Sequence, residues 1–254
     1  MCVKEMNKNG EKVNRAQLKV NERCLINLKK GKLGGPPSLA FSVCMVADAN
    51  NRVQRATERT AKLEERKCDS LDELPPFGYT DAETVNTAAK SGGRAVANWL
   101  FGGPPVIDSS LFTNDNRKEA SCQLEMLRRV GKLESTVVKA ILKEKRMAIK
   151  EDSVDSDVAL ETRLEAVFFS VVKLIREAED RLVKQVTKKC ATLPVSPATL
   201  FPGSCGQGNP TLSAVEDCVI AAARCEACLK INAFDDLDLD CDQADNQLLD
   251  SSCQ

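Results

Sequence analysis

The N-terminal segment carries a regular helical pattern of apolar positions. They recur at intervals of three, four or seven residues, as in Cys2, Met6, Val13, Ala16, Val20, Cys24 and Leu28. This spacing places the side chains on one face of an α-helix. We therefore predict an amphipathic helix from Cys2 to about Lys30, ended by Gly34-Gly35-Pro36-Pro37.

A second helix is predicted from about Ser38 to Cys68. The apolar positions that we expect to face the core are Val46, Val53, Ala56 and Leu63. The spacing of 24 residues between Cys44 and Cys68 is not a whole number of helical turns. If both cysteines face the same neighbour, the helix must bend or break, and we place that break at residues 48–51.

A third helix is predicted to begin at a capping box, Thr80-Asp81-Ala82-Glu83, and to run to about Trp99 or Phe101. The pair Gly92-Gly93 weakens this helix but suits it to close packing. Residues 102–116 begin with Gly102-Gly103-Pro104-Pro105 and continue as a polar stretch. We assign them as a linker.

Three further helices are predicted in the second half of the chain, again two long helices followed by a shorter one. A helix is predicted from about Arg117 to Lys150, and a last helix begins near Ser213 with a capping box that ends at Glu216. Between them runs the strongest apolar stripe, which we expect in the core: Leu160, Leu164, Val167, Phe168, Val171, Leu174, Ile175, Ala178, Leu182 and Val186.

Four cysteines of the first segments are spaced as two nested pairs. The position numbers of Cys24 and Cys44 sum to 68, and those of Cys2 and Cys68 sum to 70. Facing positions on two antiparallel segments have a nearly constant sum. We therefore predict two disulfide rungs across a helical hairpin, Cys24 with Cys44 and Cys2 with Cys68.

The outer rung recurs later in the chain. The segment around Cys122 echoes the one around Cys2, and the segment that ends at Cys190 echoes the one that ends at Cys68. We predict a disulfide between Cys122 and Cys190. The positions in the second copy that correspond to Cys24 and Cys44 are Glu144 and Ala166. Both cysteines of the inner rung are therefore missing together.

These patterns predict an all-α fold made of two tandem copies of a disulfide-stapled antiparallel hairpin, each followed by a shorter third helix. Residues 1–101 form the first copy and residues 117–254 the second, which ends in a Cys-rich and Asp-rich region. Aligning the third helices places Lys230 opposite Leu100.

Six more cysteines lie in the C-terminal region: Cys205, Cys218, Cys225, Cys228, Cys241 and Cys253. Cys218, Cys225 and Cys228 are spaced by seven and three residues, which places them on one helix face. Six cysteines allow fifteen pairings, and proximity along the chain favours Cys205 with Cys218, Cys228 with Cys241, and Cys225 with Cys253. A Cys₄ zinc site built from Cys225, Cys228, Cys241 and Cys253 is the alternative. The absence of a βαβ pattern argues against a thioredoxin-like redox pair.

Calcium is a second candidate ligand. Residues Asp235 to Asp242 alternate carboxylates with apolar residues, and calcium prefers oxygen ligands. An EF-hand loop that starts at Asp236 would have Cys241 in place of the required glycine and Gln247 in place of the bidentate glutamate. A solvated acidic loop is the simpler interpretation.

Composition narrows the functional classes. Aromatic residues make up 4% of the chain, which favours an aliphatic helical core, and histidine is absent. The absence of histidine excludes Ser-His and Cys-His nucleophiles and histidine metal ligands. No cofactor and no catalytic residue is indicated, so we expect a protein that is not an enzyme. No apolar run approaches the ~18 residues that span a bilayer.

Twelve cysteines in 254 residues indicate an oxidising compartment, so we expect a secreted or periplasmic protein. The N-terminal residues Met1-Cys2-Val3-Lys4-Glu5 lack the apolar stretch of a signal peptide. We therefore expect that a signal was removed or is missing from this chain.

Charge is uneven along the chain. Residues 1–68 contain 15 basic and 7 acidic residues, a net charge of +8, whereas residues 191–254 contain 2 and 10, a net charge of −8. Oppositely charged ends can attract each other within a molecule or between copies. The basic helices lack interleaved aromatic residues, which argues against nucleic-acid binding. The expected partner is a second copy or another protein.

One string of residues resembles a known group of proteins. It includes Lys189-Cys190, Phe201-Pro202-Gly203-Ser204-Cys205 and Asp217-Cys218, and continues from Arg224 to Ala233 and from Asp240 to Asp242. It resembles the uncharacterised cysteine-rich helical-repeat proteins predicted in deltaproteobacterial genomes. The resemblance implies export and disulfides, and it supplies no activity. We expect an exported structural or interaction protein with about six disulfides, and a metal-binding module is the alternative.

Overall fold

The fold is described from a computed structural model. The described residues are 2–75, 77–102, 116–151, 154–169, 172–246 and Cys253. Their regular structure is helical, and no strand occurs among them. This agrees with the predicted all-α class. None of the described helices is both long and apolar enough to cross a bilayer.

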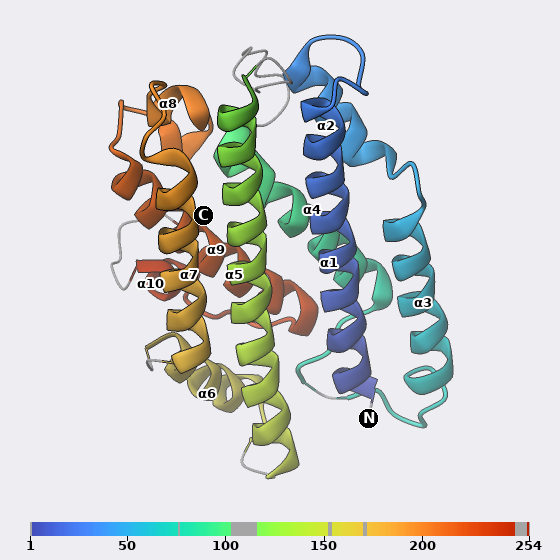
Figure 1. The fold of residues 1–254 in the computed structure, drawn as a ribbon. Helices are drawn as coiled ribbons and strands as arrows, with labels where there is room; N and C mark the ends of the chain where they lie inside the picture. The colour runs from blue at the N-terminus through green and yellow to red at the C-terminus, as the bar shows by residue number, and fades with distance from the viewer. Residues whose placement is uncertain are drawn as a thin grey trace.

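Four long helices form one layer of the molecule. They are α1 (Cys2–Lys29), α3 (Arg52–Lys67), α5 (Arg117–Lys150) and α7 (Lys173–Cys190). They stand side by side in the order α3, α1, α5, α7, with α1 in contact with α5 at the centre (Figure 1). The chain runs up α1 and down α5 in this view, so the two helices are antiparallel.

Two more helices form a second layer behind the first. They are α4 (Ala82–Phe101) and α9 (Leu212–Asp235). Helix α4 packs on α1, α9 packs on α5, and the two pack on each other (Figure 1). The described parts of residues 1–101 and 117–254 therefore share one hydrophobic core.

Short elements complete the described structure. They are α2 (Pro37–Ala47), α6 (Asp157–Phe169), α8 (Pro197–Leu200), a 3₁₀ turn (Ser204–Gly206) and α10 (Cys241–Asn246). Most of the predicted linker, residues 103–115, lies outside the described residues. The helices α1, α3 and α4 correspond in chain order to α5, α7 and α9. That the two sets arose as copies of one unit stays a prediction.

The predicted break at residues 48–51 is present and has a clear cause. Asp48 ends α2 in the left-handed region, with φ of 40°. Its carboxylate then accepts hydrogen bonds from the first free N–H groups of α3, those of Arg52 (2.9 Å), Val53 (2.7 Å) and Gln54 (3.1 Å). One side chain therefore separates α2 from α3 and caps α3.

Both predicted capping boxes are displaced from the caps that form. The cap of α4 is Asp81, whose side chain accepts from the Thr84 N–H, rather than Thr80. The cap of α9 is Thr211 rather than Ser213. Thr80 is used differently, because its hydroxyl lies 2.9 Å from the Phe234 carbonyl oxygen and donates to it.

The core contains most of the predicted apolar stripe, but that stripe lies on two helices, α6 and α7, rather than on one. Leu160, Leu164, Val167, Ile175, Leu182 and Val186 are buried. Leu174 is exposed, and so is Val46 of α2, which we predicted to face inward. The side chains of Phe168 and Val171 lie outside the described part of the chain.

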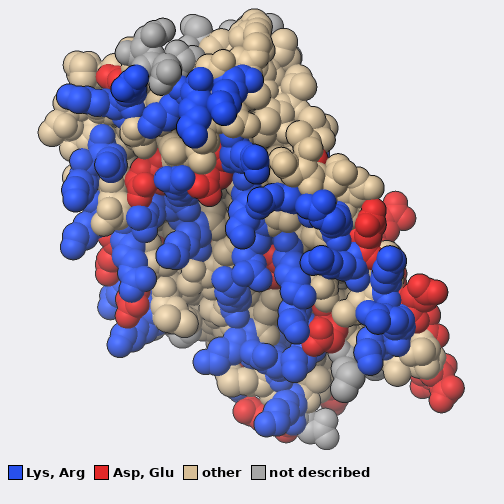
Figure 2. Space-filling view, turned by 45° about the vertical axis from the view of Figure 1, so that its right-hand side comes forward, with Lys and Arg blue, Asp and Glu red and all other residues tan. Residues whose placement is uncertain are grey.

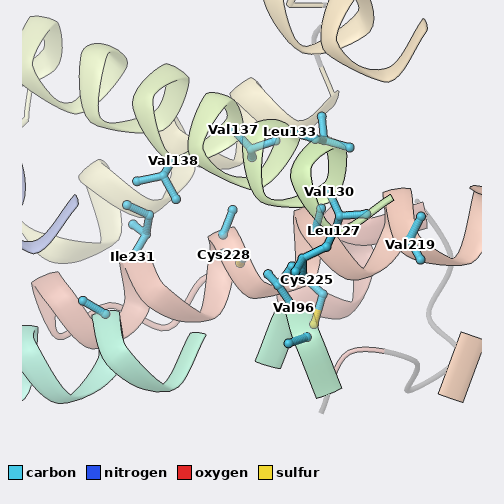
Figure 3. Close-up of a cluster of buried hydrophobic side chains, with 14 of the residues drawn as sticks. Val96, Leu127, Val130, Leu133, Val137, Val138, Val219, Cys225, Cys228 and Ile231 are labelled. Atoms are coloured by element: carbon cyan, nitrogen blue, oxygen red, sulfur yellow. The ribbon is translucent and has the colours of Figure 1, made fainter. Parts of the chain in front are cut away.

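One cluster of the core lies where α4, α5 and α9 meet (Figure 3). It is aliphatic, as the composition predicts. Its labelled members include two half-cystines of α9: Val96, Leu127, Val130, Leu133, Val137, Val138, Val219, Cys225, Cys228 and Ile231.

Candidate functional site

The structure joins all twelve cysteines in the six pairs favoured by the sequence, and none is free. The pairs are Cys2–Cys68, Cys24–Cys44, Cys122–Cys190, Cys205–Cys218, Cys225–Cys253 and Cys228–Cys241. The Cα atoms within each pair are 5.1–5.7 Å apart, the usual range for a disulfide.

The first three disulfides join helices α1, α3, α5 and α7 within the front layer or attach α2 to it. Cys2–Cys68 joins the start of α1 to the end of α3, and Cys122–Cys190 joins the start of α5 to the end of α7. Cys24–Cys44 fixes α2 to α1.

The other three disulfides tie C-terminal segments to α9. Cys205 bonds Cys218, Cys241 of α10 bonds Cys228, and Cys253 bonds Cys225. The zinc hypothesis for this cluster is wrong for the structure, since zinc binds thiolates and these sulfurs are oxidised.

The structure also gives the aspartates of the suggested calcium loop separate roles instead of one shared site. Asp235 points into the core, and Asp236 ends α9 in the left-handed region. Asp240 accepts a hydrogen bond from the Gln243 N–H at the start of α10. Among the described residues, no three His, Cys, Asp or Glu side chains come together as a metal site.

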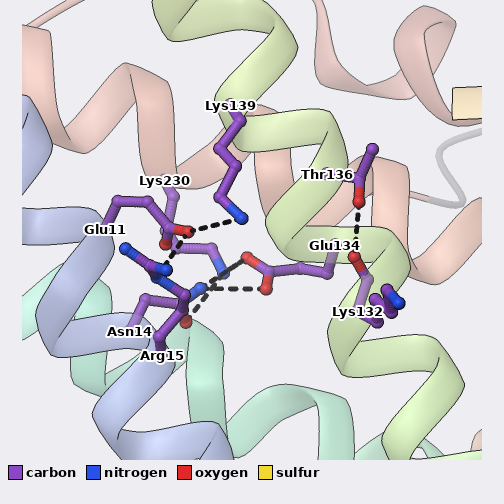
Figure 4. Close-up of polar contacts among 8 residues, drawn as sticks. All are labelled: Glu11, Asn14, Arg15, Lys132, Glu134, Thr136, Lys139 and Lys230. Atoms are coloured by element: carbon purple, nitrogen blue, oxygen red, sulfur yellow. Dashed lines mark hydrogen bonds and ion pairs between the residues drawn. The ribbon is translucent and has the colours of Figure 1, made fainter. Parts of the chain in front are cut away.

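The most unusual chemistry lies inside the core, where three helices bring charged groups together (Figure 4). Lys230 of α9 forms an ion pair with Glu134 of α5. Asn14 of α1 lies beside both, because its amide nitrogen donates to the two Glu134 oxygens at 3.0 and 2.9 Å. Lys230 Nζ also donates to Asn14 Oδ1 at 3.2 Å. All three side chains are buried.

Small residues make room for Lys230. A Cβ atom on Gly92 of α4 would lie 2.8 Å from Lys230 Cε, so the glycine lets the lysine stem pass. A Cβ atom on Gly93 would lie 2.8 Å from Gln17 Cβ of α1. The predicted close packing at this glycine pair is therefore present on both sides of α4.

Glu11 of α1 extends the polar cluster toward solvent (Figure 4). It pairs with Arg15 at 3.0 Å and with Lys139 at 3.8 Å. Burial raises the pKa of Glu11, and the positive charges of Arg15, Lys139 and Lys230 oppose this shift. Burial lowers the pKa of Lys230, and the Glu11 carboxylate opposes that shift.

A second buried ion pair lies beyond Lys230, at the C-terminal end of α9. Lys145 of α5 contacts Asp235 at 2.5 Å and donates to the Gly78 carbonyl oxygen at 2.7 Å. Asn7 of α1 donates to Asp235 at 2.5 Å. Burial raises the pKa of Asp235 and lowers that of Lys145, and each partner's charge opposes the other's shift. Both ion pairs thus connect α5 to α9, with an asparagine of α1 beside each.

One carboxyl group lies apart from these networks. Glu226 of α9 borders a small hollow with Val96, Trp99 and Val130, and burial raises its pKa to about 7. A raised pKa in an apolar setting is a property of general acids and bases. The hollow is too narrow to hold a water molecule, so it offers no room for a substrate.

The sequence reading missed these buried charges, although one signal was present. Lys230 aligns with Leu100, which is fully buried in α4, so a lysine stands at a core position. No such alignment with an apolar position indicated that Glu134 or Asn14 would be buried. The geometry as a whole describes a disulfide-stapled helical scaffold with two ion pairs buried in its core. No protein-family model, no curated protein and no solved structure matches this chain.

Proposed function

We propose that the chain is a non-enzymatic, exported protein with a structural or interaction role. The observation that carries this proposal is the complete pairing of its twelve cysteines. Disulfides of this density persist in oxidising compartments and are rare in a reducing cytosol. Each cross-link limits the freedom of the unfolded chain and adds roughly 2–4 kcal/mol of stability.

The placement of the ionisable groups supports a role without catalysis. The most buried ionisable groups described, Glu134, Lys145, Lys230 and Asp235, are paired inside the core, where a substrate cannot reach them. Paired charges of this kind hold helices in one arrangement. They offer no exposed nucleophile or base.

The surface supports an interaction role, because positive charge is concentrated in the layer of α1, α3, α5 and α7 and negative charge in the rest of the chain. Helices α1, α3, α5 and α7 contain 29 of the 36 Lys and Arg residues but 13 of the 37 Asp and Glu residues. Their net charge is +16, and the rest of the chain has −17. Figure 2 shows one face covered with Lys and Arg. Such a surface attracts acidic partners, including the acidic part of a second copy.

Mass spectrometry of the protein purified without reductant tests the proposal. The intact mass should be lower than that of the reduced chain by twelve hydrogens, and alkylating reagents should add nothing. Peptide mapping should recover Cys225 with Cys253 and Cys228 with Cys241. Free thiols in protein taken from an oxidising compartment, above all with a bound metal, would overturn it.

A further inference from the structure

Helix α2 has an apolar face that nothing in the described structure covers. Leu39, Val43 and Val46 are 52%, 59% and 60% exposed, and their spacing of four and three residues places them on one side of the helix. The surrounding stretch, residues 33–47, contains no charged residue, although 29% of the chain is charged. A row of exposed aliphatic side chains marks an interaction surface rather than ordinary surface composition.

This face is held outward by a firm attachment on the opposite side. Phe41 and Met45 are buried, and the Phe41 ring packs edge-on against Phe101 with centroids 5.7 Å apart. The Cys24–Cys44 disulfide bonds α2 to α1, and Gln17 donates to the Met45 carbonyl oxygen at 3.1 Å. The aliphatic row therefore stays exposed because its helix is anchored by its other face.

Basic residues border this apolar helix on both sides in the sequence. Lys30 and Lys32 precede it, Arg52 and Arg55 follow it, and all four are exposed. The one acidic residue at its edge, Asp48, is engaged with the N–H groups of α3.

Further cations gather near the end of α1. Burial and the charges of Arg128, Lys189 and Arg117 lower the pKa of Lys29, which shows that these groups lie close together. Figure 2 shows an uncharged area at the top of the view, the end where α2 lies in Figure 1, beside a band of Lys and Arg.

We propose that this end of the molecule docks on the surface of an anionic lipid bilayer. The Lys and Arg side chains would contact lipid phosphates, and Leu39, Val43 and Val46 would enter the interface beneath the headgroups. An apolar helix beside a polybasic surface supplies the two contributions that stable membrane attachment requires.

Charge distinguishes this partner from a second copy. A symmetric dimer through α2 would bring two sets of basic residues together, and like charges repel. Another exposed apolar pair, Leu71 and Leu74, lies among the acidic residues Asp69, Asp72 and Glu73, which an anionic surface would repel. The α2 face combines a row of three exposed apolar side chains with bordering positive charge.

Vesicle cosedimentation with the oxidised protein tests the proposal. The protein should bind equimolar phosphatidylglycerol and phosphatidylcholine vesicles at least about tenfold more tightly than phosphatidylcholine alone, and high salt should weaken binding. The triple variant Leu39→Ser, Val43→Ser, Val46→Ser should lose at least about tenfold in affinity. The matched control Leu74→Ser, Val158→Ser, Leu174→Ser changes equally exposed residues and should bind as the wild type does.

A charge variant and a fluorescent reporter separate insertion from loose adsorption. Lys30→Glu with Lys32→Glu and Arg52→Glu should abolish binding at moderate salt. Val43→Trp should show a blue-shifted emission on anionic vesicles, whereas Val158→Trp should not.

Three results would overturn the proposal. They are equal binding to both vesicle types, an unchanged affinity of the α2 triple variant, and a dimer that this variant converts to a monomer without any vesicle binding. The inference goes beyond the proposed function. Vesicle binding can fail while the six disulfides are intact, so the two tests have separate outcomes.

Discussion

Lys230 illustrates what a single buried charge requires of its neighbours. A lysine without a partner in an aliphatic core is costly, because its charged form loses its hydration. Here Glu134 and Asn14 satisfy the ammonium group, and Gly92 leaves space for its stem. These groups come from three other helices, so the lysine links the layers of the molecule.

Removing one partner of this pair should be far more damaging than removing both. We expect Lys230→Met to lower the free energy of unfolding by about 3–5 kcal/mol, since it leaves Glu134 buried without its countercharge. The double variant Lys230→Met, Glu134→Leu should recover most of this loss. Urea denaturation of the wild type, both single variants and the double variant measures the coupling. Additive losses would contradict a paired arrangement.

Glu226 should make stability depend on pH. Burial raises its pKa to about 7 from the ordinary value of 4.5, so the folded protein holds this proton more tightly than the unfolded chain does. Its contribution to stability is therefore fully present below about pH 4.5, falls as the pH rises to about 7, and is then constant.

We expect Glu226→Gln to remove this dependence and to stabilise the protein at pH 8 by up to about 3 kcal/mol. Urea denaturation at pH 5 and pH 8 measures the difference. Glu73→Gln, on an exposed loop, is the matched control and should keep the wild-type dependence. An equal pH dependence in Glu226→Gln and the wild type would show that Glu226 is not the group responsible.

At the residue scale, the sequence predicts the cysteine pairs but not the charged pairs. The hairpin pairs follow from the nearly constant sum of facing positions and its recurrence, and the three C-terminal pairs follow from proximity along the chain. Lys230 lies 216 residues from Asn14 and 96 from Glu134, and these side chains meet only after three helices have packed. A charged residue at a core position indicates that it has a buried partner, but the sequence does not identify that partner.

At the scale of elements, Asp48 is the residue that divides two helices. Asp48→Ala should lower the free energy of unfolding by roughly 1–2 kcal/mol, because three N–H groups of α3 lose their acceptor and alanine disfavours the left-handed conformation. Asp48→Asn keeps an acceptor and tolerates that conformation, so it should lose less. Thermal unfolding compares the two variants. Equal losses would contradict the capping role.

Helix boundaries were predictable where the chain contains a chemical signal. The bounds of α1 and α5 follow from apolar periodicity, and the break before α3 follows from the mismatch between Cys44 and Cys68. The separation of α6 from α7 has no such signal, since residues 160–186 contain neither glycine nor proline. The cap Asp81 lies within one predicted capping box and the cap Thr211 just before the other, because several residues there can accept the same N–H groups.

At the scale of the whole molecule, the layers could not be derived from the chain. The sequence predicts two stapled hairpins, but nothing in their patterns says that α1 and α5 lie antiparallel at the centre of one layer. The uneven charge was visible along the chain as two oppositely charged ends. In space it becomes a difference between a basic layer and an acidic remainder, because α5 and α7 add their cations to those of α1 and α3.

The disulfide map also determines how the protein responds to proteases. Every peptide bond within residues 2–68, 122–190, 205–218 and 225–253 is enclosed by at least one disulfide. A single cut in these stretches leaves one covalent molecule, whose pieces the core still holds together. Only cleavage in the intervening segments, chiefly residues 69–121 and 191–204, divides the chain. Nicked molecules should therefore outlast their first cut, which would be an advantage in the exported role proposed above.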